Sequence, residues 1–204
     1  MELSYGTPKK LADGRYYVKS FKDGEARVMV QLNKVKLLTK FDESDDVTLE
    51  LSQSALDRIS EIDAQNVAAS KVNSQSWFGK VLADQTLEAA YSKSTQDTSM
   101  NTTKARVTKI FAHDKSPVDP SSVESGIMCD VVIEFAGIWF LKKTFGPIWR
   151  IAQVRLLAPP KKLYPDEYLF QDDEPEPEAD ADEDYIWNKK NYSSILKWSS
   201  IKSP

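Results

Sequence analysis

The stretch IMCDVVIEFAGIWFLKKTFGPIWRIAQVRLL, residues 127–157, is the most apolar part of the chain and decides its fold. Its content of Val, Ile, Phe and Trp is typical of β-strands. We predict two long strands, 127–141 and 147–157, joined at Thr144-Phe145-Gly146-Pro147. Pro159 and Pro160 follow. Because proline cannot donate a hydrogen bond to a β-ladder, they should end the regular structure.

Three shorter strands are predicted upstream of this hairpin. In EARVMVQLNKVKLL, residues 25–38, Val28 and Val30 alternate with Met29 and Gln31, as in a half-buried strand. A Lys-Asp-Gly turn separates this segment from RYYVKSF, so we expect the two to form a β-hairpin. VTLEL, residues 47–51, would be the third strand.

The middle of the chain is predicted to be helical. Apolar residues recur at helical spacing in ALDRISEIDAQNVAAS, residues 55–70, and Ser52 or Ser54 can cap this helix. A second helical stretch should run over residues 75–91. The polar, aperiodic segment 92–103 predicts a loop, and a further strand should follow it at 104–113.

Strands, an intervening helical segment and more strands predict an α+β, mainly β fold. An OB-like (oligonucleotide-binding type) barrel of five or six strands, with an inserted helical segment and a disordered acidic tail, fits this order. We divide the chain into a flexible leader (1–14), an OB-like nucleic-acid-binding domain (15–170), a disordered acidic linker (171–185) and a basic-aromatic C-terminal segment (186–204).

The charge of the chain is segregated. Residues 172–184 hold nine of the 31 acidic residues and no Lys or Arg. Because they also lack large apolar residues, they should be disordered. Residues 1–170 hold 23 basic and 22 acidic residues. A nucleic-acid site in this part must therefore be a local patch, since bulk positive charge is absent.

The last hairpin carries the strongest functional signal. Six Lys or Arg residues and no acid lie between Phe140 and Leu163. Five aromatic residues lie just before these cations or among them: Phe135, Trp139, Phe140, Phe145 and Trp149. Single-stranded nucleic acid binds where aromatic faces stack on bases and cations follow the phosphates. Aromatic residues on a central hairpin are also common in cores, so we expect roughly two or three of the five inside. The candidate residues are Trp139, Phe145 and Trp149 for stacking, with Lys142, Lys143, Arg150 and Arg155 for phosphates.

A second basic-aromatic cluster lies near the beginning of the chain. Arg15, Tyr17 and Lys19 are the candidates there, and they could line the other wall of one groove. A solvated strand face with extended lysines explains the same pattern at least as well.

The sequence carries no recognisable pattern for catalysis. Cys129 and His113 are its single Cys and His, so a zinc site with three or four such ligands cannot be assembled, nor can an intrachain disulfide. A Gly-rich phosphate loop and a G-x-S-x-G elbow are also missing. We predict a protein that is not an enzyme and has no cofactor or metal. No stretch approaches the roughly 20 apolar residues that span a bilayer, and we expect neither a membrane partner nor secretion.

Three segments carry a resemblance to a known family: VIEFAGIWF (132–140), FGPIW (145–149) and QVRL (153–156). They resemble the carboxy-terminal hairpin of the single-stranded DNA-binding proteins of acidic-tailed phages and of nucleo-cytoplasmic large DNA viruses. The resemblance implies an OB barrel with an inserted helix, and sequence-non-specific binding of single-stranded DNA in viral DNA replication and recombination. It also implies an acidic tail that docks replication proteins, and a location in the host cytoplasm or nucleus.

One departure from that family concerns the tail. In the phage proteins the acidic tail ends the chain, whereas here the basic-aromatic segment YIWNKKNYSSILKWSSIKSP follows it. By its charge, the acidic run could also compete with DNA for a cationic groove, because tethering gives it a high effective concentration.

Two other functions stay open. A minor capsid or core protein of a large DNA virus would use the aromatic hairpin and the C-terminal segment to bind neighbouring subunits, and the sequence also permits a homo-oligomer. A metal-dependent nuclease is disfavoured because no carboxylate cluster lies at a predicted strand end.

Overall fold

The computed structural model describes residues 2–11, 14–25, 27–41 and 44–158. The predicted acidic linker, the basic-aromatic C-terminal segment and the expected end of the domain near residue 170 lie outside these residues.

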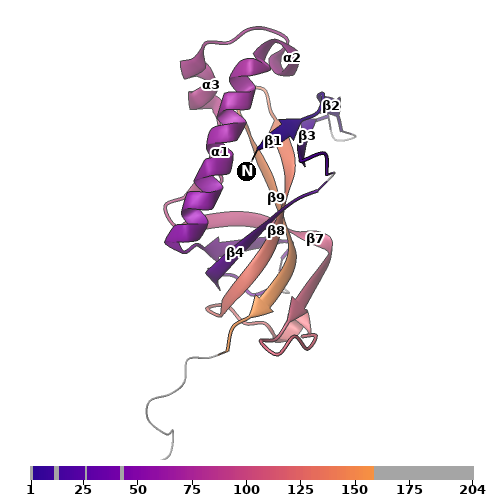
Figure 1. The fold of residues 1–204 in the computed structure, drawn as a ribbon, viewed down its shortest axis with the longest axis vertical. Helices are drawn as coiled ribbons and strands as arrows, with labels where there is room; N and C mark the ends of the chain where they lie inside the picture. The colour runs from indigo at the N-terminus through magenta and orange to yellow at the C-terminus, as the bar shows by residue number, and fades with distance from the viewer. Residues whose placement is uncertain (1, 12–13, 26, 42–43, 159–204) are drawn as a thin grey trace, which may run out of the picture. The chain divides into compact units, whose positions relative to one another are not determined.

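Five strands close into a barrel (Figure 1). They are β4 (Val28–Leu37), β5 (Asp46–Glu50), β7 (Ser99–Phe111), β8 (Met128–Phe140) and β9 (Phe145–Leu156). β4 pairs with β5, β5 with β7, β9 with β8 and β8 with β4, all antiparallel, while β7 and β9 pair in parallel. This ring order is that of an OB barrel, so the predicted α+β, mainly β fold class is confirmed.

The barrel interior follows from period-two alternation along its strands. On β4, Val28, Val30 and Leu32 are at most 2% exposed, whereas Met29 and Gln31 face outward. Every second side chain of a strand points to the same face, so each strand contributes one apolar row to the interior. The filling consists mainly of apolar, non-aromatic side chains from all five strands, with the buried ring of Phe135 among them; the others include Val30, Leu32, Leu49, Met100, Ile133 and Ile151.

The predicted hairpin of residues 15–38 is wrong in its pairing. β3 (Tyr16–Lys22) and β4 are joined by the expected turn, in which Asp23 and Gly24 have positive φ angles. β3 then pairs with Gly137–Phe140 of β8, and β4 pairs with Met128–Phe135. The two strands therefore pair with successive parts of β8. With 13 residues, mostly apolar, β8 is a longer pairing partner than β3 or β4.

The expected flexible leader is in part paired. β1 (Leu3–Tyr5) and β2 (Lys9–Lys10) are both antiparallel to β3. The Tyr5 hydroxyl donates to Oδ1 of Asn66 at 2.7 Å, and its ring meets Trp77 edge-on. Aromatic packing and a buried hydrogen bond thus hold a segment in which the sequence shows no periodicity.

Three helices lie between β5 and β7: α1 (Gln53–Val72), α2 (Ser74–Phe78) and α3 (Asp84–Ala90). α1 confirms the first predicted helix. The second predicted stretch is divided, because Gly79 takes a left-handed conformation with φ 72° and ends α2. Figure 1 shows these helices beside the end of the β8–β9 hairpin that extends beyond the barrel.

The predicted loop over residues 92–103 is only partly a loop. β6 (Thr95–Gln96) pairs with β7, and β7 begins at Ser99 rather than at residue 104. Met100 and Thr102 face the interior, while Asn101 and Thr103 are exposed. A short 3-10 turn, Pro120–Ser122, lies in the connection between β7 and β8.

Candidate nucleic-acid interface

The turn between β8 and β9 presents two of the predicted phosphate ligands. Lys142 and Lys143 are exposed, and the backbone N–H of Leu141 donates to the carbonyl of Thr144 at 2.8 Å to close the turn. In chain order, β8 and β9 are the fourth and fifth of the five barrel strands. OB barrels bind oligonucleotides on the face of their second and third strands and with the loop between the fourth and fifth. Lys142 and Lys143 lie on the turn that corresponds to this loop.

A polar hollow of about 440 Å³, which we call the Trp139 hollow, lies where β9 separates from β7. Its lining residues are Ser92, Lys93, Ser94, Thr95, Gln96, Ser99, Asn101, Trp139, Pro147 and Trp149. The third strand of the barrel, β7, contributes Ser99 and Asn101, so the hollow borders the binding face expected for the fold. Lys93, Gln96 and Asn101 are exposed and supply a cation and two amides.

Trp139 reaches this hollow because of a glycine. Gly146 pairs with Trp139 across the hairpin, and a Cβ at position 146 would come within 3.0 Å of Cζ2 of the indole. The indole Nε1 donates to the carbonyl of Pro147 at 3.1 Å. The ring is partly exposed, and this hydrogen bond fixes its orientation. A partly exposed, oriented indole is suited to stack on a base.

The opposite wall of the Trp139 hollow is anchored to α1. Asp63 accepts hydrogen bonds from Oγ of Ser94 at 2.6 Å, from the Ser94 backbone N–H at 2.9 Å and from the Tyr91 hydroxyl at 2.7 Å. Burial raises the pKa of Tyr91 far above its ordinary value, so its hydroxyl keeps the proton that it donates. Ser94 Oγ also accepts from Nε1 of Trp149 at 2.9 Å. The segment that carries Lys93 is therefore held in place from both sides.

A second hollow, the tip groove, has a volume of about 820 Å³ and lies on the other face of the hairpin end. Arg15, Lys80 and Lys142 line it together with Tyr16, whose exposed fraction is 49%. Its remaining lining residues are Pro8, Gly14, Ser76, Trp77, Phe78, Gly79, Leu82, Phe140 and Leu141. The expected meeting of the first basic-aromatic cluster with the last hairpin is thus observed at Arg15 and Lys142.

Two of the predicted stacking residues lie inside the protein. Phe145 is 1% exposed and packs against Phe78, Tyr91 and Phe140. Trp149 is 4% exposed, and its ring lies 5.0 Å from that of Phe135. With Phe135 and Phe140 also buried, four of the five hairpin aromatics are core residues, more than the two or three expected. The helices cover the inner face of the hairpin end, and this leaves Trp139 as its stacking candidate.

The two hairpin arginines lie on the outer face of the barrel, beside acids. Nη1 of Arg150 is 3.9 Å from Oε2 of Glu134. Arg155 forms an ion pair with Asp130, whose other carboxylate oxygen accepts the backbone N–H of Lys34 at 2.9 Å. Partial burial acts to raise the pKa of Asp130, but the hydrogen bonds from Arg155 and Lys34 lower it overall. Both arginines therefore already have anionic partners.

Tyr17 and Lys19 also differ from expectation in their surroundings. The Tyr17 hydroxyl donates to the carbonyl of Ala136, and its ring edge lies over Gly137. Burial raises the pKa of Tyr17, and the charge of Arg150 partly offsets this. The ammonium of Lys19 lies 5.3 Å from the centre of the Phe21 ring, outside both hollows.

Sequence reasoning missed several residues that line these hollows. Tyr16 rather than Tyr17 is exposed at the tip groove, because Tyr17 is turned over Gly137. Lys93 and Asn101 lie in the segment 92–103, for which the sequence predicts a loop and no binding residue. Lys80 lies just after α2. No local pattern marks these residues, because the fold alone brings them together.

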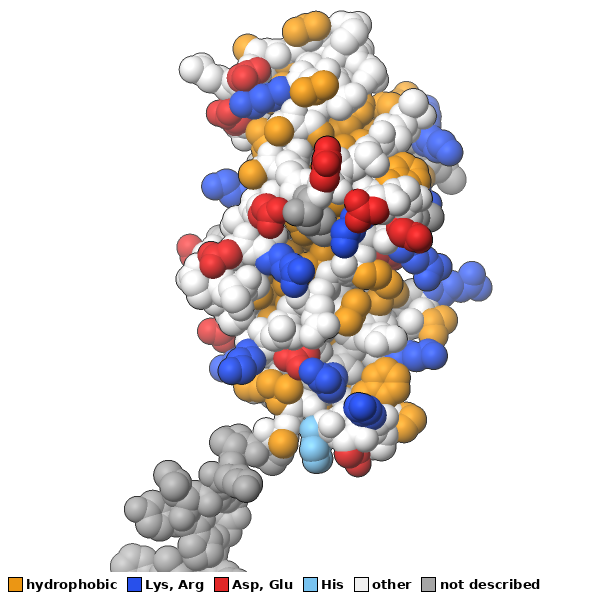
Figure 2. All heavy atoms as spheres, viewed as in Figure 1, with side chains coloured by type: hydrophobic (Ala, Val, Ile, Leu, Met, Phe, Trp, Pro, Cys, Tyr) orange, Lys and Arg blue, Asp and Glu red, His pale blue; other side chains and the backbone are white. Residues whose placement is uncertain are grey.

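The visible surface carries mixed charge. Figure 2 shows Lys and Arg side chains interspersed with Asp and Glu on the face in view. Among the described residues, no three His, Cys, Asp or Glu side chains are grouped as a metal site would require. Within the same part of the chain, none of the helices is both long and apolar enough to cross a membrane.

Comparisons with solved structures find proteins of a bacteriophage. The single-stranded DNA-binding protein of bacteriophage Enc34 in complex with ssDNA matches with a TM-score of 0.44 and 11% sequence identity, over 78% of this chain and 98% of the phage protein. Another structure of the single-stranded DNA-binding protein from bacteriophage Enc34 matches with a TM-score of 0.45 and 12% identity, over 75% of this chain and 89% of the phage protein. Its C-terminal truncation gives the same TM-score and identity, over 75% and 94%.

No curated protein matches the sequence. A family model does: it covers residues 33–172, which include β5, all three helices and the β8–β9 hairpin. The match extends over more than half of the chain, and its family is described as a family of unknown function. The chain belongs to this family, DUF5871.

Proposed function

We propose that this protein binds single-stranded DNA without sequence preference at the end of its β8–β9 hairpin. The observation that carries the proposal is the presence of two hollows at the end of one hairpin. The Trp139 hollow and the tip groove lie on opposite faces of the hairpin end. Lys142 lines the tip groove, and Lys143 is exposed beside it on the turn. The turn is also the loop that OB barrels use for oligonucleotides.

Base stacking is assigned to Trp139 and Tyr16. Both are aromatic, both are accessible, and each lies in one of the two hollows. Stacking of a base on an aromatic side chain contributes about 1–3 kcal/mol and tolerates every base, since all bases have a π-face. The side chains of Gln96, Ser99 and Asn101 can hydrogen-bond to base edges in the Trp139 hollow without requiring one base.

Phosphate binding is assigned to the cations around the turn. Lys142 and Lys143 are exposed on it, Lys80 lines the tip groove, and Lys93 lines the Trp139 hollow. They come from three separate segments of the chain. This concentration of positive charge supports binding by a domain that has little net charge, because the affinity then depends on a local patch.

The biological setting is proposed from the sequence resemblance. We assign the protein to the replication or recombination of viral DNA, in the host cytoplasm or nucleus. The acidic run at 172–184 is proposed to compete with DNA for the cationic turn or to dock replication proteins. Truncation after Phe170 keeps every element of the barrel and should strengthen DNA binding if the run competes.

The test is fluorescence anisotropy of a labelled oligo-dT titrated with full-length protein at two salt concentrations. Lys142→Ala with Lys143→Ala should weaken binding about tenfold. The slope of log affinity against log salt should fall by about 1.4, since each lost phosphate contact to a single strand removes about 0.7. Trp139→Leu should weaken binding by a similar factor with the salt slope unchanged, because it removes stacking and no charge.

The matched control is Lys22→Ala with Lys36→Ala, which removes the same charge at positions outside both hollows. Equal effects of the two lysine pairs would mean that only net charge matters and would remove the site from the turn. Absence of binding by the full-length and truncated proteins would overturn the proposal. Binding to neighbouring protein subunits of a virus particle would then be the alternative function to test.

A further inference from the structure

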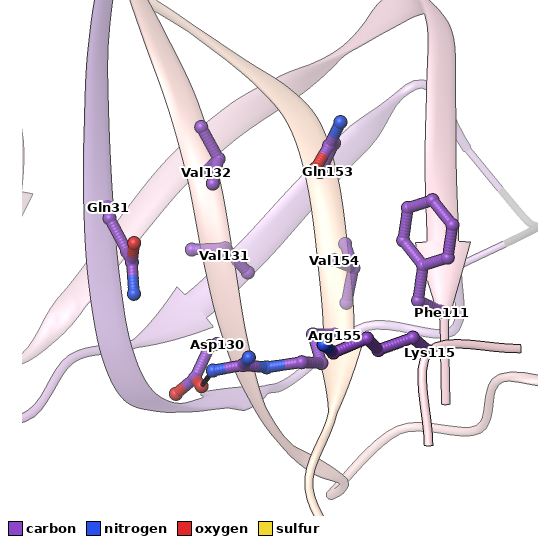
Figure 3. A pocket seen from close by; sticks show the side chains of 9 residues that line it. All are labelled: Gln31, Phe111, Lys115, Asp130, Val131, Val132, Gln153, Val154 and Arg155. Carbon is purple, nitrogen blue, oxygen red and sulfur yellow. Dashed lines mark hydrogen bonds and ion pairs between the residues drawn. The ribbon is translucent and has the colours of Figure 1, made fainter. Parts of the chain in front are cut away.

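A third hollow lies on the outer face of the barrel, away from the proposed interface (Figure 3). It has a volume of about 380 Å³, within the range of pockets that hold small ligands. Its lining residues, which define the Phe111 hollow, are Gln31, Phe111, Lys115, Asp130, Val131, Val132, Gln153, Val154 and Arg155. They come from β4, β7, β8, β9 and the turn after β7.

The register of the barrel builds this hollow. Gln31 pairs with Val132, and Val132 pairs with Gln153, so the three side chains lie in one row across the outer face. Phe111 pairs with Arg155 at the end of the parallel β7–β9 ladder. Figure 3 shows Gln31 on one side of the hollow and the Phe111 ring on the other, with Val131, Val132 and Val154 between them. The hollow thus has an apolar floor, an aromatic wall and two side-chain amides.

One end of the Phe111 hollow is cationic. Lys115 is exposed on the turn after β7, which closes through a hydrogen bond from the Lys115 backbone N–H to the carbonyl of Ala112 at 3.0 Å. Arg155 reaches across the hollow to Asp130 (Figure 3). A guanidinium has five N–H donors, and the pair with Asp130 uses one of its nitrogens. The carboxylate therefore positions Arg155 without exhausting its capacity to bind a phosphate.

We propose that the Phe111 hollow is a second station for single-stranded DNA, in which one nucleotide is held by its base and its phosphate. The base stacks on Phe111 above Val132, its edge meets the amides of Gln31 and Gln153, and its phosphate lies at Lys115 and Arg155. This inference rests on the proposed function. It extends the interface from the second- and third-strand side of the barrel onto the outer face of β4, β8 and β9.

The two stations are connected along one strand. β9 contributes Pro147 and Trp149 to the Trp139 hollow, and Gln153 and Arg155 to the Phe111 hollow. Arg150 is exposed between them on the outer face. From residue 147 to residue 155 a strand extends by about 26 Å at about 3.3 Å per residue, which several nucleotides must span. Short oligonucleotides should therefore occupy one station and long ones both.

A nucleotide fits the Phe111 hollow better than an apolar peptide side chain does. An apolar side chain would use Phe111 and the valines, but it would desolvate Lys115 and the Gln153 amide without offering either a partner, which is costly. A nucleotide offers a flat π-face, a hydrogen-bonding edge and an anion in one group. Each of the three has a counterpart in the hollow.

The experiment compares oligo-dT of about 4 and about 16 nucleotides, the range of site sizes known for OB barrels, by anisotropy with the full-length protein. Phe111→Leu with Lys115→Gln keeps an apolar side chain and removes the aromatic face and the charge. It should weaken binding of the long oligonucleotide about tenfold and leave the short one unchanged. Val107→Ala with Lys22→Gln is the control, because it trims an exposed apolar residue and one cation outside the hollow.

The outcomes separate the two proposals. If wild-type protein binds both oligonucleotides and the Phe111 variant binds the long one equally tightly, the second station is refuted and the proposed function stands. If the variant loses affinity for both lengths in equal proportion, a separate station is also refuted. Cross-linking of a long 5-iodouracil oligonucleotide to the peptide that contains Phe111 would support the station directly. If the wild-type protein binds neither oligonucleotide, the proposed function is refuted, and the second station with it.

Discussion

The two halves of the β8–β9 hairpin use the same residue types for different purposes. In the barrel half, Val131, Ile133 and Val154 point inward, and the charged pairs Asp130–Arg155 and Glu134–Arg150 lie outside. In the half beyond the barrel, the inward residues are aromatic and meet the helices. The exposed cations there lie on the turn, where the described residues show no acid beside them.

Within one apolar stretch, the barrel half packs the core, and the half beyond the barrel carries the residues proposed for DNA binding. The barrel half is closed by its ring of strands, whose interior is filled mainly by aliphatic side chains, with Phe135 and Trp149 packed together among them. The outer half has no ring to close it, and Phe140 and Phe145 bury it against α2 and Tyr91 instead. Trp139 points to the opposite face and stays accessible. The residues that we propose for DNA binding are therefore the outward ones of the outer half.

The sharpest test of this division is the stability of two aromatic variants. Phe145→Ala should lower the free energy of unfolding by about 3–5 kcal/mol, because it leaves a cavity among the rings of Phe78, Tyr91 and Phe140. Trp139→Ala should lower it by only about 1–2 kcal/mol, since the indole is only partly buried and makes one side-chain hydrogen bond. Urea unfolding followed by circular dichroism measures both. Equal losses would contradict the division into core and interface.

Elements with strong periodicity were predictable from the sequence. The β8–β9 hairpin, β4, β5 and α1 have one apolar face each, and the pattern alone identifies them. β6 and the first residues of β7 were missed, because the inward row there includes Thr102, which is polar and hydrogen-bonds to the carbonyl of Val47. The prediction that β3 and β4 pair with each other is wrong, because a turn motif does not determine which strand each of them pairs with.

The candidate site was less predictable than the fold. The sequence indicates cations and aromatics on the hairpin, and Trp139, Lys142 and Lys143 are accessible at its end. Phe145 and Trp149 are buried: Phe145 packs against Phe78 and Tyr91 of the helical segment. Trp149 packs against Phe135 and donates a hydrogen bond to Ser94. Lys80, Lys93 and Phe111 reach their hollows only through the fold. Residues that the fold brings together from separate segments share no periodic pattern in the sequence.

The junction between the two halves gives the next prediction. At Gly137 the φ angle is 142°, and a Cβ would overlap the carbonyl oxygen of Val18 and lie 2.8 Å from Cε2 of Tyr17. Gly137→Ala should therefore cost about 3 kcal/mol of stability, since the barrel and β3 would be forced apart. Gly126→Ala is the control: its φ is also positive, but its Cβ would meet nothing within 4 Å. It should cost about 1 kcal/mol. A similar cost at both glycines would show that backbone strain, and not the close contact at the junction, matters.

The smallest effect concerns the charged pairs of the barrel half. The folded pKa of Asp130 is lowered, so its contribution to stability is present above its unfolded pKa, near 3.9, and is lost as the pH falls through the folded value. Between pH 6 and pH 2, wild type should lose about 1 kcal/mol more stability than Asp130→Asn, which cannot titrate. The difference is limited because the Arg155 side chain is half exposed and water screens the pair. Urea titrations across this pH range measure it. Parallel pH profiles would mean that Asp130 is not held by Arg155 in solution, and the outer face would then lack the ordered guanidinium on which the Phe111 hollow depends.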